Sequence, residues 1–403
     1  GWNMPTLTLT LPKPHAAQRQ MIAEAKRWNV ASCGRRIGKT TLGQNRCVGP
    51  LLEGKPVGWF SPTYKMLSDV WRDMVETLQP VTKRTNASER QIELITGGIL
   101  DMWSLDNPDV ARGRKYARVV IDEAAMIPQL QNAWQMVIRP TLTDYAGDGW
   151  FLSTPKGMNF FRQCYDWGQD PGYSEWKSWK LPTSSNPYIA ASEIEAARLE
   201  LPERVFQQEY LANFLESSGG VFRGVQDAAT AHPSEPQPGG DYVMGVDWAM
   251  STDFTVLSII DRTTRQQVAL DRFNQIDWSI QRGRLKAMAD KWGVSVIIAE
   301  HNSIGGPNIE ALRNEDLPVI SFQTTATSKP PLIESLGLAF ERSELTILND
   351  PVQVAELQAY ERTISRMTGR SSYSAPAGYH DDTVMALALA WHGVAGNTGS
   401  LFL

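Results

Sequence analysis

Apolar residues follow two different patterns along the 403-residue chain. In the first half, short apolar runs alternate with longer segments of helical period, beginning with a strand at 28–33 and a helix from about Lys39. The same pattern predicts strands at 57–60, 119–121 and 150–152, a helix at 65–78, and a hairpin of 91–95 with 99–103 around Gly97 and Gly98. Alternating strands and helices predict a mainly parallel α/β sheet with helices on both faces.

The second half opens with strands alone. Three consecutive strands with short connections are predicted at 242–246, 254–260 and 267–273. They are followed by a helix at 278–292, a strand at 294–299, a helix after Gly305 and a last helix at 381–391. Three antiparallel strands followed by alternating helices and strands resemble the order of a ribonuclease H-like fold.

The segment 216–240 separates these two patterns. It is rich in Gly, Ser and Pro and has no sustained period, which predicts a linker. We therefore expect an N-terminal domain at 1–215 and a C-terminal domain at 241–403.

Composition narrows the class of protein. A chain with 42% hydrophobic and 21% charged residues is typical of a globular protein and excludes a disordered one. The net charge of −5 gives no support for nucleic-acid binding through overall basicity, so such binding would need local patches. Three cysteines are too few for a disulfide scaffold and indicate a reducing compartment. The apolar stretch 384–390 is too short to cross a bilayer, so no membrane partner is expected.

Residues 33–40, CGRRIGKT, match the phosphate-loop pattern G-x-x-x-x-G-K-[ST] except that Cys33 takes the first glycine position. The loop follows a predicted strand and opens a helix, so backbone N–H groups and the helix dipole would favour phosphate oxygens. Lys39 would contact the β- and γ-phosphates of ATP, and Thr40 would bind Mg²⁺. The alternative is a chance glycine-rich turn. The nucleotide-binding residues expected here are Gly34, Arg35, Arg36, Gly38, Lys39, Thr40 and Thr41.

A second motif has the form expected of the acidic strand that accompanies a phosphate loop. An apolar strand ends in Asp122 and Glu123. Asp122 would hold Mg²⁺ through water, and Glu123 would activate the attacking water. The alternative is a solvated strand end.

Two weaker signals accompany these motifs. Ser153 and Thr154 end the next strand, where hydroxyls would sense the γ-phosphate; the alternative is a common strand-end turn. Gln18 would read the adenine edge through its amide; the alternative is a surface glutamine.

Arginine beside the γ-phosphate stabilises transition-state charge. Arg35, inside the loop, is the best candidate within the same chain. Arg112 would act on its own site or on that of a neighbour in a ring; the alternative is a solvated or DNA-facing charge.

Carboxylates recur at strand ends after the linker. Asp247 and Glu300 each follow an apolar strand, and Asp381 and Asp382 begin the last helix. In a ribonuclease H-like sheet these places converge on one edge, and oxygen ligands suit two Mg²⁺ or Mn²⁺ ions. Helix capping is the alternative for Asp381 or Asp382.

Asp253 and His380 stand close to these carboxylates in the sequence. Asp253 is an added ligand or a turn residue, with the turn favoured. His380 is expected to orient a carboxylate from outside the metal's own ligands.

Together, these segments resemble the large terminase subunit of tailed bacteriophages over nearly the whole chain. The resemblance rests, in this order, on 33–40, 120–123, 153–155, 245–247, 299–300 and 380–382. It implies a P-loop ATPase of the RecA/ASCE-like class followed by a ribonuclease H-like nuclease. It also implies that Arg35 is the arginine acting in cis, that Ser153 and Thr154 form the coupling motif, and that Asp247, Glu300 and Asp381 or Asp382 bind metal. The family often has Asp where Glu300 stands, and the longer side chain alters the metal spacing.

The resemblance also implies a function. It predicts a motor subunit that uses ATP and Mg²⁺ to translocate double-stranded DNA into a procapsid, and that cuts concatemeric DNA with a Mg²⁺- or Mn²⁺-dependent endonuclease. The implied partners are double-stranded DNA, the portal protein, the small terminase subunit and further copies of the chain in a ring, by family example a pentamer. The implied location is the host cytoplasm, with transient docking on the procapsid.

Two other classes of function remain open from the residues alone. One is a helicase-like repair or recombination ATPase whose second domain is not a nuclease. The other is a non-catalytic assembly scaffold that uses nucleotide only to order itself.

Overall fold

The computed structural model describes residues 6–107, 109–216, 220–249, 253–274, 277–302 and 304–396. The chain divides into two compact units, the N-terminal unit up to Leu215 and the C-terminal unit from Glu216. Within the described residues, no helix combines the length and the apolar character needed to cross a membrane.

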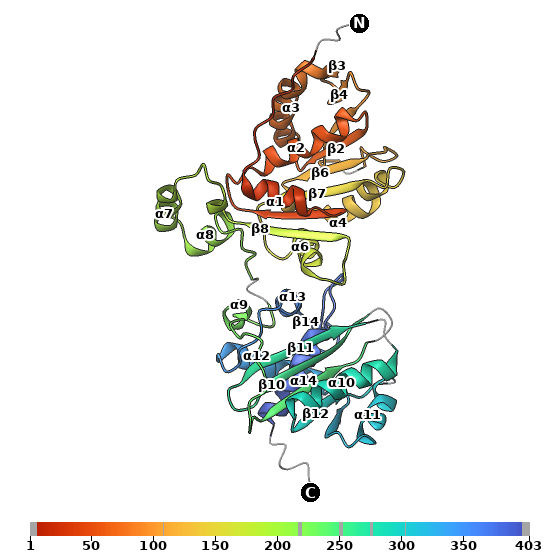
Figure 1. Ribbon diagram of the computed structural model, residues 1–403, viewed down its shortest axis with the longest axis vertical. Helices are drawn as coiled ribbons and strands as arrows, with labels where there is room; N and C mark the ends of the chain where they lie inside the picture. The colour runs from red at the N-terminus through yellow and green to blue at the C-terminus, as the bar shows by residue number, and fades with distance from the viewer. Residues whose placement is uncertain are drawn as a thin grey trace. The chain divides into compact units, whose positions relative to one another are not determined.

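A single sheet organises the N-terminal unit (Figure 1). Its strands are β1 (Trp28–Cys33), β2 (Pro56–Ser61), β3 (Thr82–Asn86), β4 (Gln91–Leu94), β5 (Ile99–Ser104), β6 (Arg118–Asp122), β7 (Asp148–Ser153) and β8 (Trp176–Leu181). The eight strands lie in the order β3-β4-β5-β2-β6-β7-β1-β8. From β5 to β8 in this order all pairs are parallel, whereas β3, β4 and β5 form an antiparallel meander. The predicted hairpin of β4 with β5 is confirmed.

Helices cover both faces of this sheet, as predicted. Successive residues of β1 point to opposite sides, so Ala31 joins the core under α1–α3 while Val30 joins the core under α4, η3 and α6. Only α7 buries none of its residues among the helices named for this unit. The helical segments are α1 (Ala16–Glu24), α2 (Lys39–Leu52), α3 (Tyr64–Leu78), η1 (Gln79–Val81), η2 (Ala124–Met126), α4 (Leu130–Ala133), η3 (Trp134–Ile138), α5 (Arg139–Thr141), α6 (Phe160–Gln169), η4 (Thr183–Ser185), α7 (Ala191–Glu200) and α8 (Glu203–Glu209).

The C-terminal unit has a five-stranded sheet in the order β11-β10-β9-β12-β13. Strands β9, β10 and β11 are antiparallel, whereas β9, β12 and β13 are parallel, which confirms the expected mixed α/β arrangement. The strands are β9 (Tyr242–Asp247), β10 (Thr255–Asp261), β11 (Gln266–Phe273), β12 (Val296–Glu300) and β13 (Val319–Phe322), with a separate hairpin of β14 (Glu361–Ile364) and β15 (Ser371–Ser374).

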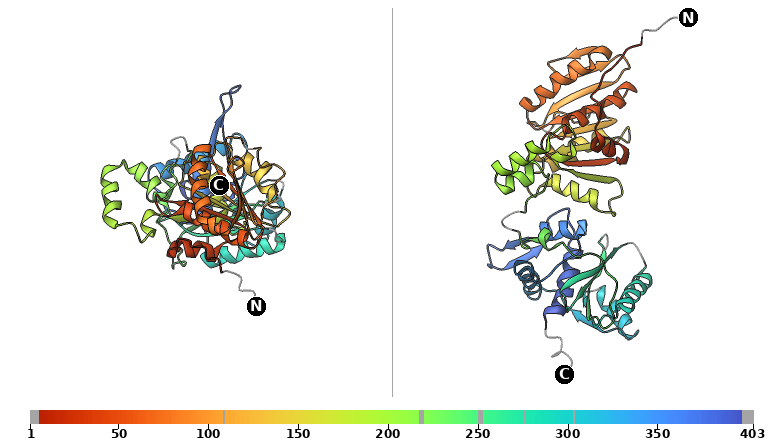
Figure 2. Two further views of the ribbon diagram at one scale, coloured as in Figure 1. Left: turned by 90° about the horizontal axis from the view of Figure 1, so that it is seen from above. Right: turned by 60° about the vertical axis from the view of Figure 1, so that its left-hand side comes forward.

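Helices again pack on both faces. In Figure 2, right, the teal helices α10 and α11 lie on one side of the sheet and the blue α12–α14 on the other. The helices are α9 (Val225–Ala228), α10 (Trp278–Trp292), α11 (Gly305–Arg313), α12 (Lys329–Glu341), α13 (Pro351–Ala359) and α14 (Asp382–Ala395). Part of the segment 216–240 is packed here, since Phe222, Val225 and Ala229 are buried against α12–α14.

The contact of α14 with β9 depends on glycine. A Cβ at Gly245 would lie 2.1 Å from the carbonyl oxygen of Ala386 and 2.5 Å from the nitrogen of Ala390. At Gly393, on the helix side, a Cβ would lie 2.5 Å from Val243. These two glycines let α14 approach the strand closely, which brings the start of α14 to the carboxyl end of β9.

Candidate functional site

The carboxyl ends of β6, β7 and β1 lie side by side, because these strands are adjacent and parallel. They end in Asp122, Ser153 and Cys33 respectively. Ligands of open α/β sheets bind at this edge. Strand β7 therefore separates the phosphate-loop strand from the acidic strand, and its Ser153 lies between the two motifs.

Cys33 occupies the first position of the phosphate-loop pattern without disturbing the loop. It is the last residue of β1 and is fully buried, and burial raises the pKa of its thiol to about 12. The next residue is the one that requires glycine, because a Cβ on Gly34 would lie 2.6 Å from the nitrogen of Thr183. Gly38 has a φ of 92°, the left-handed conformation that glycine adopts without strain.

Lys39, Asp122 and Glu123 meet beside the start of α2. The Lys39 Nζ lies 2.6 Å from Oε1 of Glu123. Asp122 is buried and accepts a hydrogen bond of 3.0 Å from the Glu123 backbone N–H. Burial and the neighbouring Glu123 carboxylate raise the pKa of Asp122 to about 7, against the opposing effect of Lys39. This cluster brings an ammonium group next to two carboxylates, groups that can bind phosphate and Mg²⁺ respectively.

The backbone of Glu123 is strained. Its φ of 47° and ψ of 44° are left-handed, which costs about 1–2 kcal/mol for an L-residue. The 3₁₀ turn η2 follows at once, and the Ser153 Oγ accepts a hydrogen bond of 3.0 Å from the Ala125 N–H. Ser153 is thus connected to the acidic motif. The Ser153 hydroxyl also donates to the Thr154 carbonyl at 2.7 Å, so Thr154 contacts this serine through its backbone.

Gln18 is buried, so the surface-glutamine alternative is wrong. Its Nε2 donates to the Gly38 carbonyl at 3.0 Å, and its Oε1 accepts from the His15 N–H. The His15 Nε2 lies 2.8 Å from the Ile37 carbonyl. Gln18 of α1 and His15, which caps this helix, therefore both contact and support the phosphate loop. This role of His15 is not predicted from sequence.

The arginines have carboxylate partners of their own. Arg35 Nε lies 2.9 Å from Oε2 of Glu209 on α8, with its side chain 62% exposed. Arg112 lies 2.9 Å from Asp109 and is 59% exposed. Thr40 and Thr41 are half-buried in the first turn of α2. The backbone carbonyl of Arg36 accepts a hydrogen bond from the side-chain amide of Asn186. The structure thus joins Lys39, Asp122 and Glu123 directly, and holds Arg35 and Arg112 by other contacts.

Asp247 and Glu300 meet at an edge of the C-terminal sheet. Strands β9 and β12 are parallel with Val246 opposite Ala299, so the two carboxylates follow as the next pair. Burial, then the hydrogen bond to Glu300 and its charge, and then the charges of Asp382 and Asp381 raise the pKa of Asp247 well above its usual range. Neighbouring carboxylates repel one another, and a divalent cation bound between them would remove that repulsion.

Asp382 and Asp381 contribute from the start of α14. Asp382 is buried and accepts from the Phe254 N–H at 3.1 Å, and burial raises its pKa to about 6. Asp381 accepts from the Tyr360 hydroxyl at 3.4 Å and lies 3.7 Å from Lys329 Nζ.

The capping alternative for Asp381 is wrong in this structure. Asp381 stands at the N-cap position of α14 but makes no capping hydrogen bond with its side chain. Glu356 of α13 accepts from the Thr383 N–H at 3.0 Å instead.

Besides the turn role favoured from sequence, Asp253 contacts His380 and lies close to Asp382. Its Oδ1 lies 2.9 Å from Nδ1 of His380, as expected for a histidine that orients a carboxylate. Asp253, His380 and Asp382 offer ligand atoms that all lie within 4.8 Å of one another. Oxygen donors with one imidazole fit Mg²⁺ or Mn²⁺, so the residues of this edge suit a divalent metal.

Several residues that contact these sites are not predicted from sequence. Most come from segments far along the chain, and no local pattern marks them. Asn159 is an exception, because it stands directly before a helical run, which is an N-cap signal. The unpredicted residues are His15, Asn159, Glu209, Lys329, Glu356 and Tyr360.

Comparison with known proteins adds to this geometry. The family model "Terminase large subunit, T4likevirus-type, N-terminal" matches residues 30–226. The terminase large subunit of Thermus virus P23-45 is 29% identical to this chain over 450 residues, covering 97% of this chain and 89% of that protein.

Two solved structures are similar to parts of the chain. The large terminase nuclease of thermophilic phage G20c with bound magnesium is 27% identical, with a TM-score of 0.41, and covers 43% of this chain and 97% of that one. The ATPase domain of the large terminase of Thermus phage P74-26 is 25% identical, with a TM-score of 0.44, covering 50% and 94%. This chain is similar over nearly its whole length to the terminase large subunits of tailed phages.

Proposed function

We propose that this chain hydrolyses ATP at the edge formed by β6, β7 and β1 to translocate double-stranded DNA into a procapsid. We also propose that it cuts concatemeric DNA at the edge formed by β9, β12 and α14. The observation that carries this proposal is the presence of two separate clusters of carboxylates, of which the first contains a phosphate-loop lysine and the second does not.

At the first edge, the contacts suggest how ATP would be used. Lys39 would leave Glu123 for the β- and γ-phosphates, and the backbone around Gly38 would hold the phosphate oxygens. Glu123, released from the ammonium, would then accept the proton of the attacking water. Thr40 and Asp122 would hold Mg²⁺, which neutralises phosphate charge when it is bound.

Charge on the γ-phosphate needs a further cation in the transition state. Arg35 would supply it after leaving Glu209, and Arg112 would act from its own or a neighbouring chain. Release of Arg35 would also remove its side-chain contact with α8, which stays connected to the loop through the hydrogen bond from the Arg35 N–H to the Glu209 carbonyl.

At the second edge, Asp247, Glu300, Asp382 and Asp381 would hold two Mg²⁺ or Mn²⁺ ions, with Asp253 and His380 beside Asp382. When bound, such ions activate water and stabilise the leaving 3′-oxygen of a phosphodiester. The protein's own contribution is orientation. The Phe254 N–H fixes Asp382, and the Tyr360 hydroxyl with Lys329 fixes Asp381.

Similarity to this family supports the proposed partners, namely double-stranded DNA, the portal protein, the small terminase subunit and further copies of the chain in a ring. Cytoplasmic action with docking on the procapsid follows from the same proposal.

The test uses the full chain with plasmid DNA. We expect DNA-stimulated ATP turnover and plasmid cleavage that needs Mg²⁺ or Mn²⁺ and stops with a chelator. ATP turnover without cleavage under either metal would favour a helicase-like ATPase. ATP binding without turnover would favour an assembly scaffold.

A further inference from the structure

Both backbone polar groups of Ala125, which belong to consecutive peptide units, are held by hydrogen bonds. Its N–H donates to the Ser153 Oγ at 3.0 Å, and its carbonyl accepts from Nδ2 of Asn159 at 3.1 Å. Ser153 ends β7 and Asn159 directly precedes α6, so both contacts come from one connection of the chain. Ala125 is buried, and it is the central residue of η2.

This turn begins at the strained residue of the acidic motif. The Glu123 carbonyl accepts from the Met126 N–H at 2.9 Å, and the Ala124 carbonyl accepts from the Ile127 N–H at 3.2 Å. A left-handed L-residue persists only where its surroundings over-determine it. The two hydrogen bonds to the Ala125 N–H and carbonyl supply such a restraint two residues after Glu123.

We propose that Asn159 is a positioning residue for Glu123, acting through the carbonyl of Ala125. The inference rests on the proposed role of Glu123 in ATP hydrolysis. Ser153 holds the preceding peptide unit through the Ala125 N–H, so two hydrogen bonds from the β7–α6 connection position the turn that carries Glu123.

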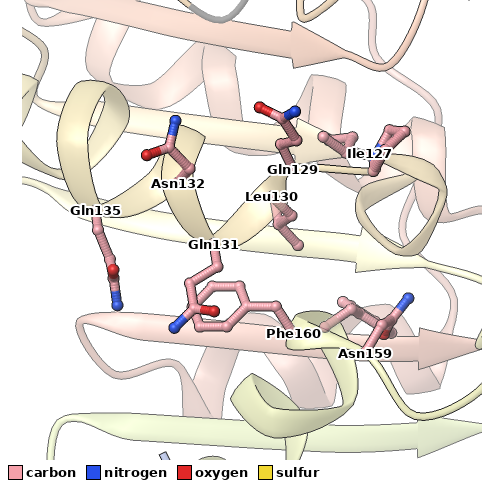
Figure 3. A pocket seen from close by; sticks show the side chains of 10 residues that line it. Ile127, Gln129, Leu130, Gln131, Asn132, Gln135, Asn159 and Phe160 are labelled. Atoms are coloured by element: carbon pink, nitrogen blue, oxygen red, sulfur yellow. The ribbon is translucent and has the colours of Figure 1, made fainter. Parts of the chain in front are cut away.

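A cavity lies next to this contact. Asn159 and Phe160 line one part of a pocket of about 500 Å³, and Ile127, Gln129 and Leu130 line another (Figure 3). Beside the cavity, Ile127, Leu130 and Phe161 are buried in one core, and the Asn159–Ala125 hydrogen bond adds a polar contact between the same two segments.

The two ends of the Asn159 amide have separable tasks. The Oδ1 caps α6 by accepting from the Arg162 N–H at 3.3 Å, while Nδ2 holds Ala125. Asp in this place keeps the capping oxygen but cannot donate to a carbonyl. Ser also caps helices well, and its side chain is too short to replace the Nδ2 contact.

The test compares Asn159→Asp and Asn159→Ser with the unchanged full chain. We expect kcat for ATP hydrolysis to fall at least about tenfold in both variants, since small misplacement of a catalytic group has large effects on rate. The KM for ATP, the affinity for ADP and the Tm should stay close to those of the unchanged chain, because the cap of α6 is kept.

Two results would overturn the inference. One is unchanged kcat in both variants, and the other is a parallel loss of kcat, ADP affinity and Tm, which would indicate a merely structural role. Glu123→Gln separates this from the proposed function. If Glu123→Gln keeps its ATPase activity, the proposed role of Glu123 fails; if it loses activity while both Asn159 variants keep theirs, only the positioning role fails.

Discussion

The two acidic edges differ in how their charge is balanced. At the first, Lys39 lies 2.6 Å from Glu123, so the protein itself supplies a cation to the pair of carboxylates. At the second, burial and the neighbouring Glu300 carboxyl group raise the pKa of Asp247 well above its usual range, and Lys329 lies 3.7 Å from Asp381. Under the proposed function, Mg²⁺ enters and leaves the first site with each nucleotide, so the Lys39 ammonium balances the charge of the carboxylates in between. The carboxylates of the second site are instead available to the metal ions that we propose there.

The largest expected effects separate the two edges. Glu123→Gln should lower ATP turnover about 10²–10⁴-fold, the usual contribution of a general base, and leave plasmid cleavage unchanged. Asp247→Asn should abolish plasmid cleavage and leave ATP turnover unchanged, since it removes a carboxylate that we propose as a metal ligand. Steady-state ATPase and plasmid-nicking assays on the full chain measure both. Equal loss of both activities in either variant would contradict two independent centres.

Gly245→Ala tests how the second edge is built. Its Cβ would press on the backbone of α14, so we expect the C-terminal unit to lose about 3 kcal/mol of stability together with nuclease activity. Gly283→Ala in α10 is the matched control, since a Cβ there meets nothing within 4 Å. Alanine should stabilise that site by about 0.4–1 kcal/mol. Urea unfolding that shows equal effects for the two substitutions would disprove this account of the packing.

Asp122→Asn tests how far Lys39 neutralises the first edge. The pKa of Asp122 is about 7 in the folded protein and about 3.9 when unfolded, so between these values the folded state binds a proton that the unfolded state lacks. Stability therefore falls as pH rises through this window. Without nucleotide, the variant should gain about 1 kcal/mol or more at pH 8 and almost nothing at pH 4. Urea midpoints at the two pH values measure this, and a gain independent of pH would argue against it.

The smallest effect concerns Glu209→Gln. It weakens the hold on Arg35, whose side chain is 62% exposed, and such ion pairs contribute about 0–1 kcal/mol. The KM for ATP should therefore fall by less than about fivefold, with kcat nearly unchanged. A rise in KM would show that Glu209 holds Arg35 in its binding position instead of away from it.

Local patterns predict the strands that position both sites. The apolar runs of β1, β6, β7, β9 and β12 are buried at almost all positions and end in polar or reactive residues, so their ends were visible in the sequence. By contrast, β3 buries no residue, and β8 buries Ser178 beside Trp179, so neither has a clear strand pattern.

The contacts that complete the sites join distant segments. Arg35 and Glu209 are 174 residues apart, and Asp253 and His380 are 127 apart. No local spacing encodes such pairs, because they depend on how helices and loops pack. The position of Glu123 in a left-handed conformation likewise follows from the turn that surrounds it.

The Lys39–Glu123 ion pair has a consequence for which molecules can react at the first edge. While the ammonium is bound to it, the carboxylate is a poor proton acceptor, and only a ligand with several negative charges competes well for Lys39. Under the proposed function, a monoanionic ester that enters the loop would leave the base blocked, whereas a triphosphate would unblock it on arrival. Selectivity by charge number is then built into the resting site, before any contact with the sugar or the base.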